Sequence, residues 1–498
     1  MRTPTHFNHR IANNERCVRL PTGVTFIGSE FAHSSFDHLQ CLSSMPTKTA
    51  ASLSIPSTTL LRDKGLASPA KARETSPQRA ETAASSSSNK EPRILFVDQS
   101  GQLGGAEICL LPLAVRCTQR SEVLLLSDGP FRERLQAEGV RVSIDTDARI
   151  SSIKKDRMRF AAFAALPGIM RQVRSIAARA KSFDIVFLNT QKALILGAFG
   201  HALHRKPTVW HVHDIVSRAH FGRVHLLLIK WAVKIGVDHV IANSRASADA
   251  LIELTGLPRS AVPVVHNGVD VARFAGNAKQ AVAPIDERRA LRGLPTNAFL
   301  VGLFGRFTAW KGQHVALDAI ARVPNAHLVL VGDALFGETD YAESLRAQAK
   351  TLGITERVHF AGFQHDVASW MNVMDVVVHA STQPEPFGLV IIEAMAAGKP
   401  VIASNGGAVS EILRNLENGL IVEPNDAPKL GEAISTLQRA PELATRLAAQ
   451  GHADAGQHFS IEQYLRHMTR VLFGIATPTP KADRDVKLAK APGAANHR

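Results

Sequence analysis

Short apolar runs alternate with helical patterns along most of the chain, and this alternation restricts it to an α/β fold. Runs of this length without polar alternation are typical of parallel strands that are covered on both faces. The helical patterns between them would supply the crossovers that a parallel sheet requires. In the first half the expected strands are residues 93–97, 123–126, 140–144, 185–188, 208–211 and 240–242. A second α/β unit contains the runs 298–304, 328–331, 358–363, 374–381, 401–403 and 418–422.

The composition is that of a globular protein with anionic partners. The chain has 498 residues, which is enough for two or three domains with a sizeable core. Lys and Arg number 58 against 44 Asp and Glu, a net charge of +14. This excess favours nucleotide sugars, acidic lipid surfaces or nucleic acid as partners. Cys17, Cys41, Cys109 and Cys117 have no ligand-like spacing, so we expect reduced thiols in a cytoplasmic protein.

The two ends of the chain differ from its middle. Ser, Thr, Ala and Pro dominate from Ser43 to Ser88, and no apolar periodicity is present there. Such a composition cannot bury enough apolar surface to offset chain entropy, so we expect residues 1–91 to form a poorly ordered extension. No apolar segment of the kind found in secretory signals occurs in it. Residues 477–498 are rich in Pro, Ala and Lys and are expected to form a disordered tail.

One stretch of the second unit combines a proline-flanked loop, a glycine and the start of a helix. Prolines on both sides of Glu385 oppose regular structure, and we expect a helix to begin at Leu389. Phe387, Gly388 and Leu389 would then present backbone N–H groups at a helix N-terminus, which favours anions. Glu393 would lie about one turn inside the helix, near the same end as Glu385. The simpler alternative is that Glu385 caps the helix and that Glu393 is a solvated helix residue.

Two further turns join a strand to a helix. Arg306 and Lys311 follow a strand and precede a helix expected to begin at Gln313, so two cations and a helix dipole would suit a diphosphate. Gly104 and Gly105 lie in the turn after the first strand. Because their spacing is not GxGxxG, a dinucleotide fingerprint is not supported. A phosphate-binding turn and a simple tight connection are equal alternatives for this loop.

Two histidines, His211 and His213, stand at the end of a strand, and we expect them on opposite faces of the sheet. Ligand sites in open α/β sheets lie outside the carboxyl ends of the strands, which is where His213 falls. We therefore favour His213 over His211 as a functional residue. The triplet from Asp145 to Asp147 spells DxD, a metal-binding pattern, but it follows a strand in the first half. We interpret it as a chance match.

Two stretches of the first half, residues 154–181 and 218–234, combine apolar and basic residues. Neither is long enough to span a bilayer. Each would either lie on an anionic membrane surface with its apolar side down or pack against the core with a solvated basic face. The sequence leaves these two alternatives open.

The motifs of both halves resemble those of one enzyme family. The stretch from Glu385 to Glu393 resembles the E-x7-E signature of the retaining glycosyltransferases of family 4. Residues 305–312 are similar to the family's G-R-x-x-x-x-K-G element, and Gly-Gly-Ala-Glu at residues 104–107 looks like its first loop. The resemblance covers about residues 93–474.

The fold that this resemblance implies is GT-B, an α/β architecture in which two Rossmann-like domains face each other across a cleft. Residues 92–280 would form the acceptor domain and residues 281–455 the donor-nucleotide domain. A C-terminal helix within residues 456–476 would cross back to the first domain.

The implied reaction is transfer of a sugar from a nucleotide-diphosphate sugar to a glycan or lipid-linked acceptor, with retention at the anomeric carbon. Cell-surface polysaccharide or glycoconjugate synthesis is the expected setting. Neither a metal nor a cofactor is expected. A cytoplasmic enzyme is implied, with stretches 154–181 and 218–234 available for peripheral attachment to the inner face of the plasma membrane. No motif identifies the donor base, the sugar or the acceptor.

The family's site residues map onto the positions that match its motifs. Glu393 would bind the ribose hydroxyls. Glu385 and the backbone of residues 387–389 would hold the sugar and the phosphate. His213 would orient the sugar or stabilise developing positive charge. Arg306 and Lys311 of the second domain would neutralise the diphosphate. Gly104 and Gly105, in the first loop of the first domain, would approach it.

Two other classes of function are compatible with parts of the sequence. A GT-B enzyme of another reaction, such as an epimerase or phosphorylase, would share the cleft, and product analysis with an added acceptor would separate it. A non-enzymatic protein that binds nucleic acid or another anion would explain the charge alone. No helix-turn-helix, zinc or RNP-like motif supports that class, so no nucleic-acid partner is expected.

Overall fold

The computed structural model describes residues 91–146, 158–276, 283–334 and 338–476, and side chains of residues 158–165 are not included. The predicted N-terminal extension, apart from residue 91, and the predicted tail 477–498 lie outside the described residues. Asp147 and the start of the basic stretch 154–181 lie outside them as well.

The first half forms a parallel sheet of six strands in the order β3-β2-β1-β4-β5-β6. This order is that of a Rossmann-type doubly wound sheet, and it confirms the predicted strands with small shifts at their ends. The strands are β1 Ile94–Asp98, β2 Glu122–Leu125, β3 Val142–Ile144, β4 Ile185–Leu188, β5 Thr208–Val212 and β6 His239–Ala242. The helices are α1 Gly105–Arg116, α2 Pro130–Ala137, α4 Met158–Ala180, α5 Gln191–His204, α6 Arg223–Gly236 and α7 Arg245–Thr255.

The second half repeats this topology in the order β12-β11-β10-β7-β8-β9. Its strands are β7 Phe299–Phe304, β8 Ala326–Val331, β9 Val358–Gly362, β10 Val376–His379, β11 Val401–Ser404 and β12 Leu420–Val422. The helices are α8 Val271–Phe274, α9 Ile285–Ala290, α10 Gln313–Ala321, α11 Thr339–Thr351, α12 Val367–Met371, α13 Leu389–Ala396, α14 Val409–Ile412, α15 Ala427–Arg439, α16 Pro441–His458 and α17 Ile461–Ala476.

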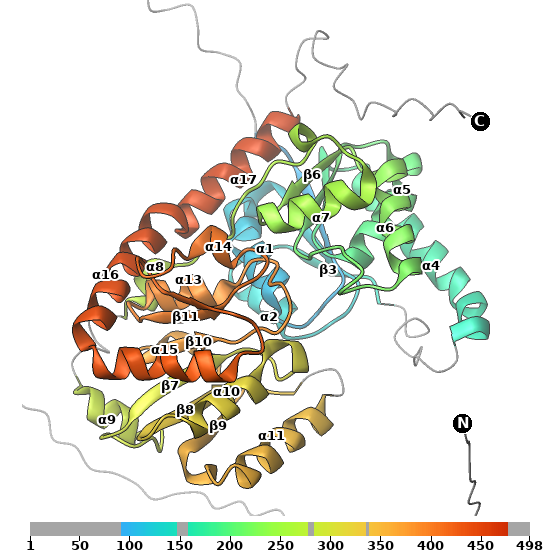
Figure 1. Ribbon diagram of the computed structural model, residues 1–498. Coiled ribbons are helices and arrows are strands. Elements are labelled where there is room, and N and C mark those ends of the chain that lie inside the picture. Colours follow the sequence, from blue (N-terminus) through green and yellow to red (C-terminus); the bar gives the residue numbers. More distant parts are fainter. Residues whose placement is uncertain (1–90, 147–157, 277–282, 335–337, 477–498) are drawn as a thin grey trace, which may run out of the picture. The chain divides into compact units, whose positions relative to one another are not determined.

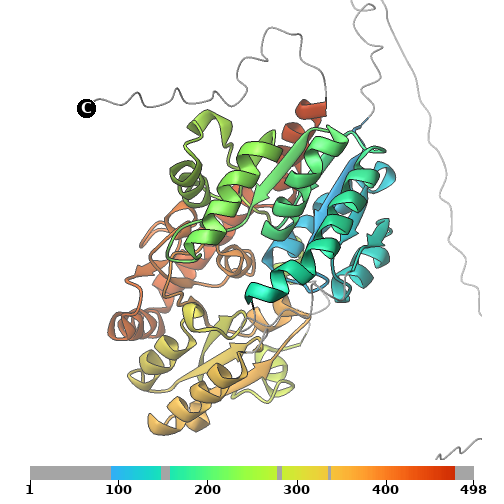
Figure 2. The ribbon, with the colours of Figure 1, turned by 90° about the vertical axis from the view of Figure 1, so that its right-hand side faces the viewer.

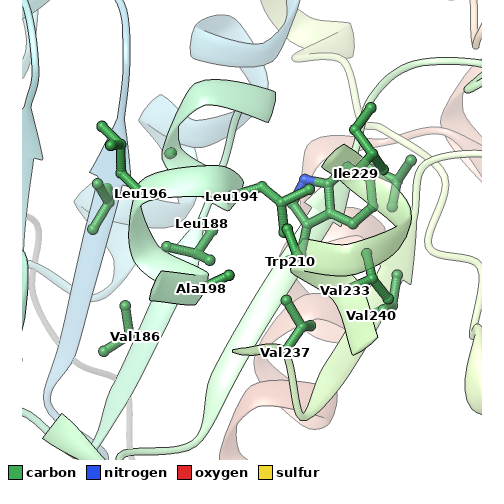
Figure 3. Packing of buried hydrophobic residues seen from close by; sticks show 14 of the residues in the cluster. Val186, Leu188, Leu194, Leu196, Ala198, Trp210, Ile229, Val233, Val237 and Val240 are labelled. Carbon is green, nitrogen blue, oxygen red and sulfur yellow. The ribbon is translucent and has the colours of Figure 1, made fainter. Parts of the chain in front are cut away.

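Each sheet is covered on both faces, and apolar residues occupy most positions of its strands. In β1, Leu95 and Val97 pack with α4 to α7, whereas Ile94 and Phe96 pack with α1, α2 and α17. Figure 3 shows the first of these layers, in which Trp210 of β5 lies against residues of α6. Continuous apolar strands of this kind are the expected consequence of burial on both faces.

Helix α17 returns to the first domain, as the resemblance implied. Its buried face consists of Tyr464, Met468 and Leu472, which pack into the apolar layer beneath the first sheet. The Tyr464 hydroxyl donates to the backbone oxygen of Cys109 in α1 at 3.0 Å. Figure 1 shows α17 (red) running alongside α1. Cys109 and Cys117 are buried and unbridged.

Helices α4, α5 and α6 lie side by side over one face of the first sheet (Figure 2). Gly236 of α6 approaches α5 so closely that an added Cβ would lie 2.2 Å from the backbone oxygen of Ala198. Among the described residues, no helix is long and apolar enough to cross a bilayer.

Candidate active site

The loop before α13 lies where the carboxyl ends of the second sheet's strands meet. Gly388 is the N-cap of α13 and has a φ of 96°, a left-handed conformation that disfavours residues with a side chain. Within the described residues, no protein acceptor takes the backbone N–H groups of Phe387, Gly388 or Leu389. The predicted helix start and its open N–H groups are therefore present, and they form a site suited to an anion.

Glu385 is the centre of a buried hydrogen-bond cluster. Its Oε2 accepts from Lys311 Nζ at 2.8 Å, from His379 Nε2 at 2.9 Å and from the Ser381 hydroxyl at 2.9 Å, and its Oε1 accepts from Lys311 at 3.0 Å. Burial by itself would raise the pKa of Glu385, but the Lys311 charge and then His379 hold that pKa well below its usual range. The simpler alternative, in which Glu385 caps α13, is wrong because Gly388 occupies the cap and Glu385 binds Lys311 instead.

Lys311 reaches Glu385 because the preceding turn is tight. Gly312, with a φ of 71°, ends the short 3₁₀ turn Ala309–Lys311 and caps α10. An added Cβ at Gly312 would lie 1.9 Å from the backbone oxygen of Ala380, so the turn packs directly on the strand that leads to Glu385. The Lys311 ammonium also lies 4.1 Å from the centre of the Trp310 ring, a favourable cation–π distance.

Arg306 begins the same turn and is half-buried at the carboxyl end of β7. Its backbone oxygen accepts from Gln313 Nε2 at 2.9 Å, which ties the start of the turn to the first residue of α10. Arg306 and Lys311 thus bracket one short turn at the helix N-terminus, in agreement with the sequence pattern.

Glu393 lies in the second turn of α13 and is half-buried. Burial raises the pKa of this carboxyl to about 7, and the Arg273 charge acts in the opposite direction. The structure thus shows Glu393 partly shielded from water and not fully solvated.

The glycine turn of the first domain faces α13. A Cβ added to Gly105 would lie 3.6 Å from Leu389 Cδ1, so the N-termini of α1 and α13 adjoin. Gly104 caps α1, and its N–H donates to Glu107 Oε2 at 3.0 Å. Burial, and then the charge of Asp98, raise the pKa of Glu107 to about 8. The loop is a tight connection, and it also lies against the side chain of Leu389, the first residue of α13.

His213 lies at the end of β5, but the expectation that it and His211 point to opposite faces is wrong. Their ring centroids are 4.0 Å apart, because residues separated by two positions in a strand share a face. Asn189 Oδ1 accepts from His213 Nε2 at 3.0 Å. The amide nitrogen of Asn189 donates to Asp98 Oδ2 at 2.6 Å, which orients the amide and makes Nε2 the protonated nitrogen of His213. Burial lowers the pKa of His213 to about 3, so its ring is neutral.

The sequence of each half matches a known family pattern. The pattern described as "Glycosyltransferase Family 4" matches residues 103–273, and that described as "Glycosyl transferases group 1" matches residues 284–454. The solved structure of Anabaena Alr3699/HepE in complex with UDP and glucose is 36% identical to this chain. It superimposes with a TM-score of 0.69 and covers 76% of this chain and 99% of its own. This chain belongs to glycosyltransferase family 4.

Curated relatives match over a shorter stretch. The lipopolysaccharide core biosynthesis glycosyltransferase LpsE of Rhizobium meliloti is 35% identical over 45% of this chain and 61% of its own length. The D-inositol 3-phosphate glycosyltransferase of Mycolicibacterium smegmatis is 29% identical over 50% of this chain and 56% of its own. The match therefore spans little more than half the length of these relatives. As the resemblance implied, the family 4 chain described here has the GT-B fold.

Sequence reasoning missed several polar side chains of this family 4 site. Asp98 is the last residue of β1 and Asn189 directly follows β4, whereas His379 ends β10 and Ser381 lies just after it. Polar residues at carboxyl strand ends are a recognisable signal for a ligand site in an α/β sheet. The pairing of Asp98 with Asn189 could not be predicted, because the two residues belong to segments that are 91 positions apart in the sequence.

The DxD triplet shows no metal-binding arrangement in its described part. Asp145 Oδ1 lies 3.4 Å from Arg171, and Asp147 is outside the described residues.

Proposed function

We propose that this protein transfers a sugar from a nucleotide-diphosphate sugar to an acceptor hydroxyl, with retention of the anomeric configuration. The observation that supports this most directly is the pairing of Lys311 with Glu385 beside the open N–H groups of α13. Since the HepE neighbour was solved with UDP and with UDP-glucose, UDP is the first nucleotide to test.

Departure of the leaving group builds negative charge on the diphosphate, and three features of the second domain would stabilise it. The N-terminus of α13 carries about half a positive charge and offers N–H donors. An ammonium has three donors, of which Lys311 uses two on Glu385, so the third can reach a phosphate oxygen. Arg306, on the same turn, would add a second cation. With this set of donors, charge stabilisation requires no metal ion.

The two glutamates have separate roles in this mechanism. Glu393 would accept hydrogen bonds from the ribose hydroxyls, which its half-buried position near the α13 N-terminus favours. Glu385 Oε2 already accepts three hydrogen bonds and Oε1 only one. Oε1 therefore retains the capacity to accept from a sugar hydroxyl.

His213 and the glycine turn would complete the cleft from the first domain. Because Nε2 of His213 carries the proton and donates to Asn189, only Nδ1 is left to accept from a hydroxyl of the sugar or acceptor. The acceptor oxygen would bond to the anomeric carbon on the face from which the diphosphate leaves. The bond to the phosphate oxygen breaks, and the leaving phosphate takes the acceptor's proton, so no protein nucleophile is required.

Calorimetric titration of UDP, GDP and ADP tests the donor site. We expect one nucleotide to bind in the presence of EDTA, and Glu393→Ala and Lys311→Ala to weaken it at least about tenfold. Lys429→Ala, an exposed lysine on α15, is the matched control and should leave binding unchanged. If none of the nucleotides binds to the folded wild type, the donor-site assignment is wrong. Product analysis with an added acceptor then separates transfer from an epimerase or phosphorylase reaction.

The acceptor would be a glycan or a lipid-linked saccharide, and α4, α5 and α6 would hold the enzyme on an anionic membrane. These adjacent helices expose large apolar side chains that are not covered in the described residues: Leu166, Met170, Phe199, Leu203, Val224, Leu227, Leu228, Trp231 and Ile235. Exposed Arg171, Arg174, Arg223 and Lys234 lie on the same helices. An apolar surface bordered by basic residues is complementary to an anionic headgroup layer.

Sedimentation with vesicles tests this attachment. Wild type should bind vesicles that contain phosphatidylglycerol and not those of phosphatidylcholine alone. The double substitution Leu227→Ser/Trp231→Ser should abolish binding, whereas Leu291→Ser, an exposed leucine of the second domain, should not. Equal binding by the double variant refutes the attachment, and self-association without vesicle binding would instead identify the surface as a contact between two copies.

A further inference from the structure

Helix α7 of the first domain contacts the loop that holds Glu385. Ser244, the N-cap of α7, accepts from the Ser247 N–H at 3.0 Å and donates its own hydroxyl proton to the backbone oxygen of Pro386 at 2.6 Å. The Ser247 hydroxyl lies 3.4 Å from the same oxygen. Both serines are fully buried. A hydroxyl from one domain therefore binds the backbone of the other domain's donor loop.

A carboxylate of the second domain completes this contact. Glu411 of α14 accepts from the backbone N–H groups of Arg245 and Ala246, both at 2.9 Å, and from His266 Nε2 at 3.0 Å. Its side chain is only 5% exposed. Burial alone would raise the pKa of Glu411, but the His266 hydrogen bond and then the two backbone N–H groups lower it. An ionised carboxylate thus caps the positive N-terminus of α7 from the opposite domain.

His266 fixes the same contact from the segment that links the domains. Because a carboxylate can only accept, His266 donates from Nε2. Its ring lies 5.8 Å from the ring of Phe387 and 5.7 Å from that of Phe459. Ser244, His266 and Glu411 come from three separate segments of the chain, and they meet at this contact.

We propose that Ser244 and Glu411 are positioning residues that make the geometry of the donor loop depend on the contact between the two domains. The inference rests on the proposed function. The C=O of Pro386 and the N–H of Phe387 belong to one planar peptide unit. A hydrogen bond that holds the Pro386 oxygen toward Ser244 therefore directs the Phe387 N–H away from α7. That N–H is one of the donors assigned to the leaving diphosphate.

The two residues act at different distances from the loop. Ser244 touches the loop directly, whereas Glu411 holds the helix end that carries Ser244. Loss of either should leave the nucleotide's contacts with Glu393 and Lys311 intact. The Phe387 N–H matters most when charge develops on the phosphate, so a misdirected N–H should slow the reaction more than it weakens donor binding.

The test compares Ser244→Ala and Glu411→Gln with two matched controls in the full chain. Ser344→Ala removes an exposed hydroxyl on α11, and Glu432→Gln removes an exposed carboxylate on α15. We expect kcat to fall at least about tenfold in the first two variants while KM for the donor changes less than about threefold. Both controls should match wild type. A kcat of Ser244→Ala within about twofold of wild type would overturn the proposal.

Amide hydrogen exchange gives a second measurement that does not need activity. In Glu411→Gln, the amides of Arg245 and Ala246 should exchange faster because a charged acceptor is lost. In both variants the first turn of α13, where Ile391 donates to Gly388, should also exchange faster than in the controls. If the wild type transfers no sugar, the proposed function is wrong. The exchange pattern still tests whether the contact with α7 affects the loop before α13. Unchanged exchange in α13 refutes the coupling even in an active enzyme.

Discussion

Replacing Glu385 by Gln tests whether the centre of the candidate site is held together by charge. The Glu385 side chain is 9% exposed and that of Lys311 is 19% exposed, so their ion pair is largely shielded from water. Gln keeps the shape of the side chain but removes the charge and replaces one acceptor oxygen by an NH₂ group. At least one donor among Lys311, His379 and Ser381 would then face another donor.

Loss of one partner of a buried ion pair costs about 3–5 kcal/mol, because the other charge stays buried without compensation. For a domain of this size the loss corresponds to a fall in unfolding midpoint of about 6–20 °C. Thermal unfolding monitored by circular dichroism measures this fall in midpoint, provided that the transition of the second domain is resolved. Glu432→Gln, whose carboxylate is exposed and pairs with Lys429, is the control and should unfold with wild type.

The pH dependence makes this prediction specific to charge. The pKa of Glu385 lies well below its ordinary value of 4.5 in the folded protein, so its stabilising contribution is complete above that value and disappears as the pH falls through the lowered pKa. The difference between wild type and Glu385→Gln should be constant from about pH 5.5 to 8 and should narrow below about pH 4. Equal midpoints for the two proteins near neutral pH would refute the argument that Lys311 holds Glu385 as an ion.

Three further changes have definite expected results. Because burial raises the pKa of Glu393 to about 7, stability should fall as the pH rises from 4.5 to 7, and this slope should be smaller in Glu393→Gln, in which only other buried carboxyls such as Glu107 still contribute. Gly312→Ala should unfold at a much lower temperature than Gly353→Ala, since both have a φ near 70° but only Gly312 would place its Cβ against the Ala380 oxygen. Nitrogen-15 NMR of His213 should show a neutral ring with Nε2 protonated down to about pH 5, and an imidazolium at pH 6 would contradict its assigned environment.

Local pattern was sufficient to predict most of the fold. Every position of β4 is apolar, as is every position of β1 before Asp98, and such runs are enough to recognise strands that are covered on both faces. The start of α13 was equally predictable, because Pro386 opposes regular structure and Gly388 permits the left-handed φ of the cap. The prediction that His211 and His213 point to opposite faces was wrong because residues two positions apart in a strand share a face. The sequence alone contained the information needed to avoid this error.

Side-chain partners between distant segments were not predictable. Lys311 was expected to face a phosphate, and the structure shows its ammonium bound to Glu385, which lies 74 residues further along the chain. Asp98 and Asn189, which orient His213, lie 91 residues apart. Sequence spacing does not predict such pairs, because the two residues meet only when folding brings their segments together.

The sequence by itself determined the two α/β halves, the parallel strands, the glycine turns and the family to which the chain belongs. All of these depend on residues close together in the chain, whose apolar pattern and backbone preferences act locally. Only the tertiary structure decided the protonated nitrogen of His213, the lowered pKa of Glu385 and the raised pKa of Glu393. Only the packing of α7 against the donor loop brought Ser244 to the Pro386 oxygen. The reason is physical: burial and hydrogen-bond partners set the charge of a polar group, and both come from segments that only folding brings together.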